Sequence, residues 1–379
     1  VLAEIDQTMV QRAPVLSPAL QLNIADNDLT AGFDAKLRKS LLESMLVDVM
    51  AHKAGETPLV LVLEDCHWLD ALSYDLLEEI ALRIEKLPVL IIRTFRGLER
   101  ELARDLPVSN MSHHSTMELS PLTGEDLALL ARLRLERIAT NGRDAAATET
   151  LAKRIAQQSD GNPFYLEELV NYVGHEARDV DPNELSALDL PSSLHGLVLS
   201  RVDQLQERPK TVLKVASIVG RVFQSSWLEG IYPELGDLGE INDYMQELCR
   251  QNFTVYDPAE GEDTYYFRNI ITRGVIYDSL LHKMRTNLHE QTGLFLEQTY
   301  AGSQDQYLDL LAYHYDHSPN VDKKRFYLRR AGEFAQRSYA NDAAINYYRK
   351  VLPLLDVDDH IEILLKLGDI DRLVGQWDE

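Results

Sequence analysis

Two adjacent carboxylates directly follow a short apolar run in the first quarter of the chain. The run is Leu59–Leu63, entered through Pro58, and the acids are Glu64 and Asp65. Such a run predicts a strand buried on both faces of a parallel sheet. At the carboxyl end of such a strand, an acidic pair can hold Mg²⁺ and orient the water that attacks a nucleoside triphosphate. The alternative is a solvated strand end, with Asp70 capping the next helix.

A second strand is predicted to end beside these acids. The apolar spacing over Ala71–Leu87 indicates an amphipathic helix, and Val89–Ile92 predicts a second buried strand. A βαβ unit brings both strand ends to one edge of the sheet, so Thr94 and Arg96 should meet the two acids there. The first strand and its acids have the form of a Walker B element. Arg96 could then sense a γ-phosphate, and the alternative is a surface arginine.

A sharp corner between two predicted helices follows. One helix is expected over Ala145–Gln158, after which Gly161 ends it and Pro163 begins the next helix, with Asn162 between them. A purely structural corner explains this pattern. In a lid packed over a nucleotide, the same corner could contact the base.

Other motifs of nucleotide, metal or nucleophile chemistry are missing from the sequence. No GxxxxGK[ST] occurs, so the principal cradle for a triphosphate is lacking. Cys66 and Cys249 stand far apart, which predicts neither a disulfide framework nor a zinc site. No apolar run approaches the ~20 residues needed to cross a bilayer. These features predict a cytoplasmic protein that does not bind membranes.

The net charge opposes polyanionic partners. The chain of 379 residues has 38 Lys+Arg against 61 Asp+Glu, a net charge of −23. Nucleic acid and anionic membrane surfaces are repelled by such a charge. Protein or small-molecule partners are therefore favoured.

The remaining elements can be placed from their apolar spacing. Asp34 is expected to cap a helix over Ala35–His52, and Ser115–Leu119 is expected to form a further strand. The polar segment 174–192 predicts a linker. Helices are expected after it over Ser193–Gln204, Pro209–Ile218, Gln224–Ile231 and Leu238–Cys249. A small hairpin of Phe253–Tyr256 and Tyr265–Arg268 follows them, and this order is typical of a winged helix.

The last part of the chain shows one repeat signature. Ala331, Phe334, Ala343 and Tyr347 have the spacing at which small and aromatic residues interlock the two helices of a tetratricopeptide repeat. A second repeat is expected to begin at Leu367. Such repeats need neighbours to bury their faces, so more are expected beyond Glu379.

Taken together, these elements resemble the AAA-related STAND ATPases. They are especially similar to bacterial ATPase modules that lie between a class III adenylate/guanylate cyclase domain and a tetratricopeptide array. The most specific segments are EDCHWLD and GNPFYLEEL, with further support from LPSSLHGLVLSRVDQL and FRNIITRGVIYDSLL. The resemblance covers nearly the whole chain.

The resemblance implies roles for individual residues. Glu64 would take the metal-associated acid position, indirectly for Mg²⁺, and Asp65 that of the acid that polarises water. Arg96 would be the sensor arginine, with Thr94 on the same strand end facing the nucleotide. The GxP corner that contacts nucleotide would be Gly161-Asn162-Pro163. ATP and Mg²⁺ are the implied cofactors. The missing phosphate loop departs from the family pattern, and the expectation is that the chain begins after it.

The expected fold class is a partial α/β P-loop-NTPase-like core with a parallel sheet, followed by an all-α lid, a winged helix and a tetratricopeptide-like α-solenoid. The expected domains are residues 1–120 for the C-terminal part of the core, 121–175 for the lid, 176–192 for the linker, 193–300 for the winged helix and 301–379 for the first repeats.

The expected function is a signal-transduction switch. ATP binding and hydrolysis would control an attached effector such as a nucleotide cyclase, and protein partners would bind the winged helix and the repeats. The alternatives are a non-enzymatic interaction scaffold and an ATP-dependent transcriptional regulator of the same class. Residues 1–379 alone are expected to bind ATP feebly and not to hydrolyse it. The incomplete sheet should leave apolar residues of both strands uncovered, which invites self-association.

Overall fold

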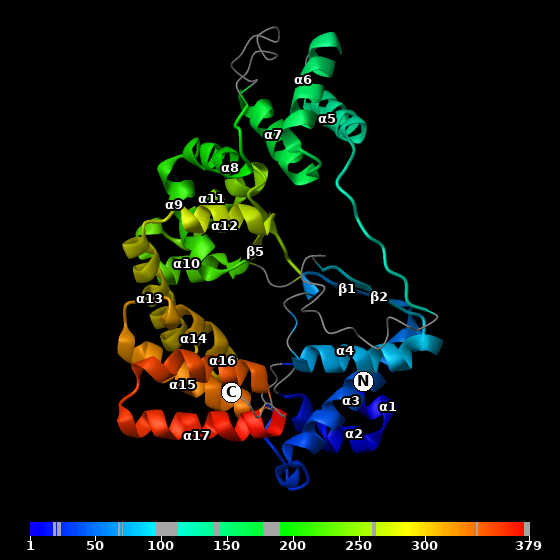
Figure 1. The fold of residues 1–379 in the computed structure, drawn as a ribbon, viewed down its shortest axis with the longest axis vertical. Helices are drawn as coiled ribbons and strands as arrows, with labels where there is room; N and C mark the ends of the chain where they lie inside the picture. The colour runs from blue at the N-terminus through cyan, green and yellow to red at the C-terminus, as the bar shows by residue number, and fades with distance from the viewer. Residues whose placement is uncertain are drawn as a thin grey trace. The chain divides into compact units, whose positions relative to one another are not determined.

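The part of the chain described by the structure, a computed structural model, is mostly helical with two small sheets (Figure 1). The described residues are 1–17, 20, 24–66, 69, 71–95, 113–138, 145–176, 190–259, 263–338 and 340–374. They form two compact units. The first comprises Val1–Thr116, Leu296–Asp316 and Asn320–Glu379, and the second comprises Met117–Phe295 and His317–Pro319.

The first unit begins with short helices and the predicted βαβ segment. Helices α1 (Leu2–Ile5) and α2 (Gln7–Gln11) precede the long α3 (Ala35–Glu56). The Asp34 side chain accepts a hydrogen bond of 2.8 Å from the Leu37 amide, so the predicted cap is confirmed. The predicted helix is also confirmed, although it continues past residue 52.

The two predicted strands pair in parallel. Strand β1 (Leu59–Leu63) lies beside β2 (Val89–Arg93) in the register Leu59↔Val89 to Leu63↔Arg93, with α4 (Ala71–Arg83) between them in sequence. The parallel arrangement predicted for the βαβ unit is confirmed. Only these two strands are paired in this sheet among the described residues, so a larger P-loop core is not shown.

One face of this sheet is covered and the other is exposed. Alternate residues of both strands pack against α3 and α4, in clusters that include Val47, Leu77 and Ile80. The opposite residues are 43 to 59% exposed, namely Val60, Val62, Leu90 and Ile92. The prediction that both faces are buried is therefore wrong for the described residues. The expectation that apolar side chains of these two strands are uncovered is confirmed.

The predicted strand Ser115–Leu119 does not form. These residues are extended without strand pairing, and Met117 and Leu119 are 84% and 85% exposed. Alternating apolar residues stabilise a strand only where a neighbouring strand and a core face receive them. Neither is present here among the described residues.

The second unit starts with three helices around a core. They are α5 (Gly124–Ile138), α6 (Ala145–Ser159) and α7 (Pro163–Glu176). Fully buried side chains from all three meet, among them Leu135, Ile155 and Leu169. The predicted linker lies largely outside the described residues. Where the chain is described again, Leu190 packs on this core and the Pro191 carbonyl accepts 2.7 Å and 2.8 Å hydrogen bonds from Tyr165 and Gln158.

The rest of the second unit is a helical domain with a three-stranded antiparallel sheet. The predicted helices are confirmed with small shifts at their ends, as α8 (Leu194–Asp203), α9 (Glu207–Val219), α10 (Ser225–Ile231) and α11 (Leu238–Arg250). The predicted hairpin is β4 (Thr254–Tyr256) with β5 (Thr264–Phe267), and β3 (Val222–Gln224) pairs with the other side of β5. The three-residue β3 is too short to show a period in the sequence.

A buried ion pair joins the three-helix core to this domain. The Glu168 carboxylate on α7 pairs with the Arg201 guanidinium on α8, and both side chains are at most 5% exposed. Arg201 also donates a 2.5 Å hydrogen bond to the Gln251 carbonyl and lies 4.5 Å from the centre of the Phe253 ring. Its charge is thus matched by a carboxylate, a carbonyl and an aromatic face.

A buried histidine of α13 (His282–Thr299) contacts α12 (Ile270–Asp278). His289 is fully buried, its Nε2 is 3.0 Å from the Tyr277 hydroxyl, and its ring stacks on His317 with 5.0 Å between centroids. Burial is the main cause that lowers the pKa of His289 to about 3, and the charges of His317, Arg273 and Arg285 act in the same direction.

This lowered pKa predicts a loss of stability in mild acid. The unfolded chain takes up a proton at His289 near pH 6.5, whereas the folded chain does so only near pH 3. The stability that the neutral His289 contributes to the folded chain is therefore fully present above pH 6.5 and decreases as the pH falls below that value. Between pH 7 and pH 5 the free energy of unfolding should decrease by about 2 kcal/mol on this account. Urea titrations of the wild type and of His289→Gln measure it. The decrease in the free energy of unfolding should be smaller in His289→Gln and unchanged in a variant of the exposed His195. The same dependence on pH in the wild type and both variants would contradict this prediction.

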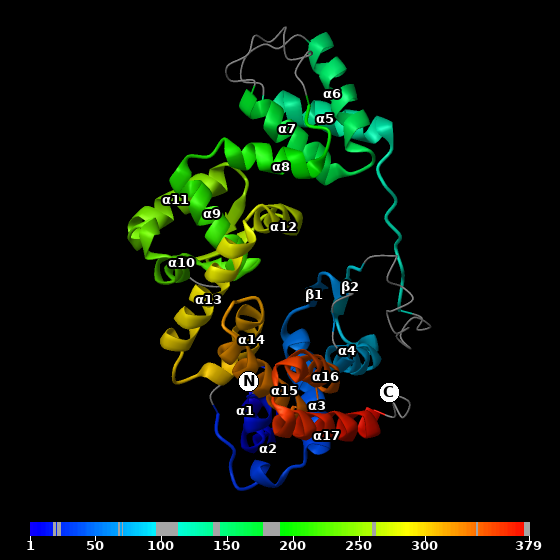
Figure 2. The same cartoon turned by 60° about the vertical axis from the view of Figure 1, so that its left-hand side comes forward.

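The end of the chain consists of antiparallel helices that pack on their sequence neighbours (Figures 1 and 2). They are α14 (Leu308–Asp316), α15 (Val321–Arg337), α16 (Asn341–Val351) and α17 (Val357–Val374). In the predicted interlocking set, Ala331 is buried as expected, whereas the members on α16 are displaced by one residue. A Cβ on Gly332 would lie 2.6 Å from the Tyr348 ring, and Ala344 and Tyr348 are fully buried, whereas Ala343 and Tyr347 are only partly buried. The displacement arises because adjacent residues share the small and aromatic pattern.

Candidate functional site

The ends of β1 and β2 are tied together by Thr94. Its amide donates to the Leu63 carbonyl at 2.9 Å, and its carbonyl accepts from the Cys66 amide at 2.8 Å. Its hydroxyl oxygen accepts a 3.1 Å hydrogen bond from the Asp65 amide. These bonds hold the segment after β1 against the end of β2. The predicted meeting of the acidic pair with Thr94 at one sheet edge is therefore present.

The acidic pair itself lies in an unusual turn. Asp65 has φ +55°, a left-handed conformation that aspartate and asparagine tolerate better than most residues. Glu64 is exposed and Asp65 is partly exposed. Cys66 beside them is buried, its thiol donates to the Leu63 carbonyl at 3.2 Å, and burial raises the pKa of this thiol. Burial therefore disfavours the thiolate form that a nucleophile needs.

The donor set at this edge fits a magnesium ion that also binds phosphate. Magnesium sites commonly use one or two carboxylates together with waters and substrate phosphates. Glu64, Asp65 and the Thr94 hydroxyl would be the protein's oxygen donors in such a site. No cluster of three or more histidine, cysteine or acidic side chains suited to a metal occurs in the ranges described above. Arg96, the predicted sensor, lies outside the described residues.

The glycine-proline corner belongs to the second unit. Gly161 has φ +80° and follows Asp160 at φ +46°, which turns the chain between α6 and α7. The Gly161 carbonyl accepts a 3.1 Å bond from the Leu122 amide, and Asn162 Oδ1 accepts from the Phe164 and Tyr165 amides at 3.0 and 3.2 Å. Asn162 is thus the cap of α7, and Pro163 is its first residue; the sequence predicts the helix start at Pro163 but not the cap. A contact between this corner and a nucleotide stays a prediction.

Alanine at Gly161 is expected to destabilise the second unit. A Cβ there would stand 2.6 Å from the Pro121 Cβ, and the left-handed backbone would be strained for any L side chain. The two effects should lower the free energy of unfolding by about 2 kcal/mol. Urea unfolding measures this, with Gly124→Ala as the control because nothing lies within 4 Å of a Cβ there. Equal stability of the two variants would contradict the observed corner.

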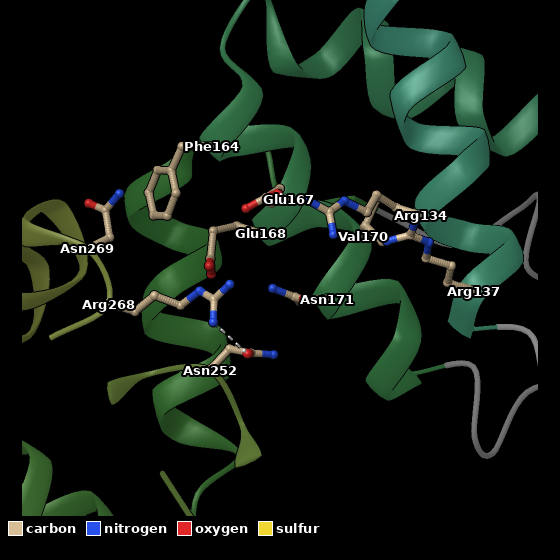
Figure 3. Close-up of a pocket in the computed structure, with 10 residues that line it drawn as sticks. All are labelled: Arg134, Arg137, Phe164, Glu167, Glu168, Val170, Asn171, Asn252, Arg268 and Asn269. Carbon is tan, nitrogen blue, oxygen red and sulfur yellow. Dashed lines mark hydrogen bonds and ion pairs between the residues drawn. The ribbon is translucent and has the colours of Figure 1, made fainter. Parts of the chain in front are cut away.

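A pocket of about 300 Å³ opens beside α7, between the three-helix core and the domain that follows (Figure 3). Its walls come from α5, from α7, from the turn after α11 and from the junction of β5 and α12. The lining residues are Arg134, Arg137, Phe164, Glu167, Glu168, Val170, Asn171, Asn252, Arg268 and Asn269. Sequence reasoning does not find this site, because its walls lie far apart in the chain.

The lining side chains of this pocket that carry a charge without an ion-pair partner among the described residues are positive. Arg134 pairs with Glu167 at 2.6 Å, and Glu168 is held by Arg201. Arg268 donates to the Asn252 side-chain oxygen at 3.2 Å, and neither it nor Arg137 forms an ion pair with a described residue. In Figure 3 the Arg268 guanidinium and the Asn171 amide point into the same space, with the Phe164 ring nearby. The pocket can therefore accept an anionic group beside an aromatic ring.

No family model matches the chain. An uncharacterized protein of Rhizobium meliloti (strain 1021) is 28% identical over 270 residues, which is 69% of this chain and 25% of that protein. The chain thus spans about a quarter of the length of this curated relative.

A solved structure from Pyrococcus horikoshii, a Signal Transduction ATPase with Numerous Domains (STAND) protein with a tetratricopeptide repeat sensor, aligns with a TM-score of 0.48 and 11% identity, covering 89% of this chain and 50% of that one. Both values are too low to carry an argument about fold or function. Among the described helices, none has the length and apolar character that a membrane span requires.

Proposed function

We propose that this chain is the signal-transducing part of a STAND-type regulatory ATPase. The observation that carries the proposal is the sheet edge where Glu64 and Asp65 follow one parallel strand and the Asp65 amide donates a hydrogen bond to the Thr94 hydroxyl at the end of the next. Acidic and hydroxyl groups at this place suit Mg²⁺ and a triphosphate. The resemblance of the surrounding segments to STAND ATPases agrees with it.

In this proposal each of the named residues has a separate role in ATP hydrolysis. Glu64 helps to hold Mg²⁺, which would neutralise charge on the phosphates when bound. Asp65 accepts a proton from the attacking water, and Thr94 keeps Asp65 in place through the hydrogen bond to its amide. Arg96 responds to the γ-phosphate. Gly161, Asn162 and Pro163 contact the nucleotide from the helical lid.

The proposed architecture follows the expected domains. Residues 1–120 belong to the nucleotide-binding core, 121–175 to the lid, 193–300 to a winged helix and 301–379 to the first repeats. Binding and hydrolysis of ATP would shift the protein between two states with different affinity for an effector. A nucleotide cyclase is one such effector.

The test is Mg²⁺-dependent ATP binding and turnover by the full-length protein. Slow turnover that depends on Mg²⁺ supports the proposal. The second candidate is an interaction scaffold, which is favoured by the lack of a GxxxxGK[ST] loop in this sequence. A full-length protein that binds no ATP in the presence of Mg²⁺ would establish the scaffold and overturn the switch.

A further inference from the structure

The pocket beside α7 has no role in the proposed ATP switch, and its walls come from separate parts of the second unit. Phe164, Val170 and Asn171 belong to α7, whereas Arg268 and Asn269 lie at the junction of β5 and α12. Its volume of about 300 Å³ is at the lower end of the range for ligand pockets. This volume holds about ten groups the size of a water molecule, so a ligand of about ten non-hydrogen atoms fits.

The Arg268 guanidinium is held at this pocket by a neighbouring amide. Asn252, in the turn after α11, has φ +61°, a left-handed conformation that asparagine tolerates. Its side-chain oxygen accepts a 3.2 Å hydrogen bond from Arg268 Nη1. Because an amide carries no net charge, this bond orients the guanidinium without neutralising it. Arg268 is exposed, so an anionic ligand can reach it from solvent.

The charges that line the pocket match a ligand with a single negative charge. Three arginines and two acids line it, which leaves one positive charge in excess. Glu167 is paired with Arg134 and Glu168 with Arg201, but both carboxylates stay at the pocket wall. They repel an ion with several negative charges, such as a phosphate or a nucleotide. A carboxylate carries one charge and binds a guanidinium through two parallel hydrogen bonds.

The remaining walls favour a flat ring that carries a polar group. Phe164 presents an aromatic ring, on which a second ring can stack with about 4.5 to 7 Å between centroids. The side-chain amide of Asn171 can both donate and accept a hydrogen bond. In Figure 3 this amide and the Arg268 guanidinium face the same space, beside the Phe164 ring. A ring with a carboxylate at one end and a hydroxyl at the other satisfies all three side chains.

We propose that the pocket beside α7 binds a small aromatic monocarboxylate. The Arg268 guanidinium pairs with the carboxylate, the ring lies against Phe164, and Asn171 bonds to a polar group on the ring. Because the walls belong both to the three-helix core and to the domain that follows, the bound ligand favours the arrangement in which both parts line the pocket. The inference does not depend on whether the chain uses ATP.

The test is isothermal titration calorimetry of the intact chain with 4-hydroxybenzoate. We expect a Kd below about 1 mM for a ligand of this size. Arg268→Met should raise Kd about tenfold, because the charged hydrogen bonds to the carboxylate are lost. Arg268→Lys should raise Kd less, since lysine keeps the charge without the two parallel bonds. The control Arg250→Met changes an exposed arginine of α11 that does not line the pocket, and it should leave Kd unchanged.

One variant should bind more tightly, which damage to the fold cannot explain. Glu167→Gln removes a carboxylate from the pocket wall and releases Arg134 from its ion pair. The excess of positive charge then rises, so the Kd of 4-hydroxybenzoate should fall about threefold. Thermal unfolding without ligand compares the fold of each variant with that of the wild type.

Related compounds identify the chemical class of the ligand. 4-Hydroxybenzamide has the ring without the charge and acetate has the charge without the ring, so each should bind about tenfold more weakly or worse. The proposal is overturned if Arg268→Met binds 4-hydroxybenzoate like the wild type, or if Glu167→Gln does not bind it more tightly. It is also overturned if 4-hydroxybenzamide binds equally well, if inorganic phosphate or ADP displaces 4-hydroxybenzoate at lower concentration, or if 4-hydroxybenzoate does not bind at millimolar concentration.

Discussion

Replacing Asp65 with asparagine is expected to slow ATP turnover by the full-length protein about a hundredfold or more while ATP affinity stays within about twofold. A positioned proton acceptor contributes roughly 10²- to 10⁴-fold to a reaction rate, and the amide of asparagine cannot accept the proton. Binding should persist because this side chain acts on the water and not on the phosphates. The expected effect is therefore on turnover alone.

Asparagine is the right replacement here for a structural reason. Asp65 has φ +55°, a conformation that asparagine adopts readily and alanine does not. The bond from its amide to the Thr94 hydroxyl should thus survive. Turnover under saturating ATP and Mg²⁺ is compared with that of Glu85→Gln, an exposed acid of the same unit. If Asp65→Asn turns over ATP like the control, Asp65 has no part in the chemistry.

Loss of the buried carboxylate at residue 168 is expected to have the largest effect on stability. Glu168→Gln should lower the free energy of unfolding of the second unit by about 3 to 5 kcal/mol, because it leaves the Arg201 charge buried without a counterion. The Gln251 carbonyl and the Phe253 ring that also contact Arg201 cannot replace a full negative charge.

The neighbouring residue on α7 provides the matched control. Glu167 pairs with Arg134 at the surface, where the two side chains are 38% and 44% exposed, so Glu167→Gln should cost less than about 1 kcal/mol. A double variant Glu168→Leu/Arg201→Met should regain much of the stability lost in Glu168→Gln, since both charges are then removed. Urea unfolding followed by circular dichroism compares the four proteins. A cost for Glu168→Gln no larger than for Glu167→Gln would show that the pair is solvated in solution.

The positions of the predicted residues agree with the structure where one strand end or one corner carries the signal, and their roles stay predictions. The acidic pair and Thr94 were predicted at neighbouring strand ends, and the start of a helix was predicted at Pro163, where the structure has them. The pocket beside α7 was not predicted, because it is assembled from side chains whose positions depend on packing between helices. The sequence did not predict the burial of Glu168 for the same reason, because its partner Arg201 is 33 residues away in the chain.

The sequence by itself determined the local elements, because their signals act over a few residues. The caps at Asp34 and Asn162, the apolar strand Leu59–Leu63 and the turn at Gly161 depend on neighbouring side chains and on backbone preference. Tertiary structure alone decided which face of that strand is covered, that Gly332 and Tyr348 interlock, and that Asn252 holds Arg268 at the pocket beside α7. Each of these depends on which helix packs against which, and that choice is made by buried surface summed over many residues.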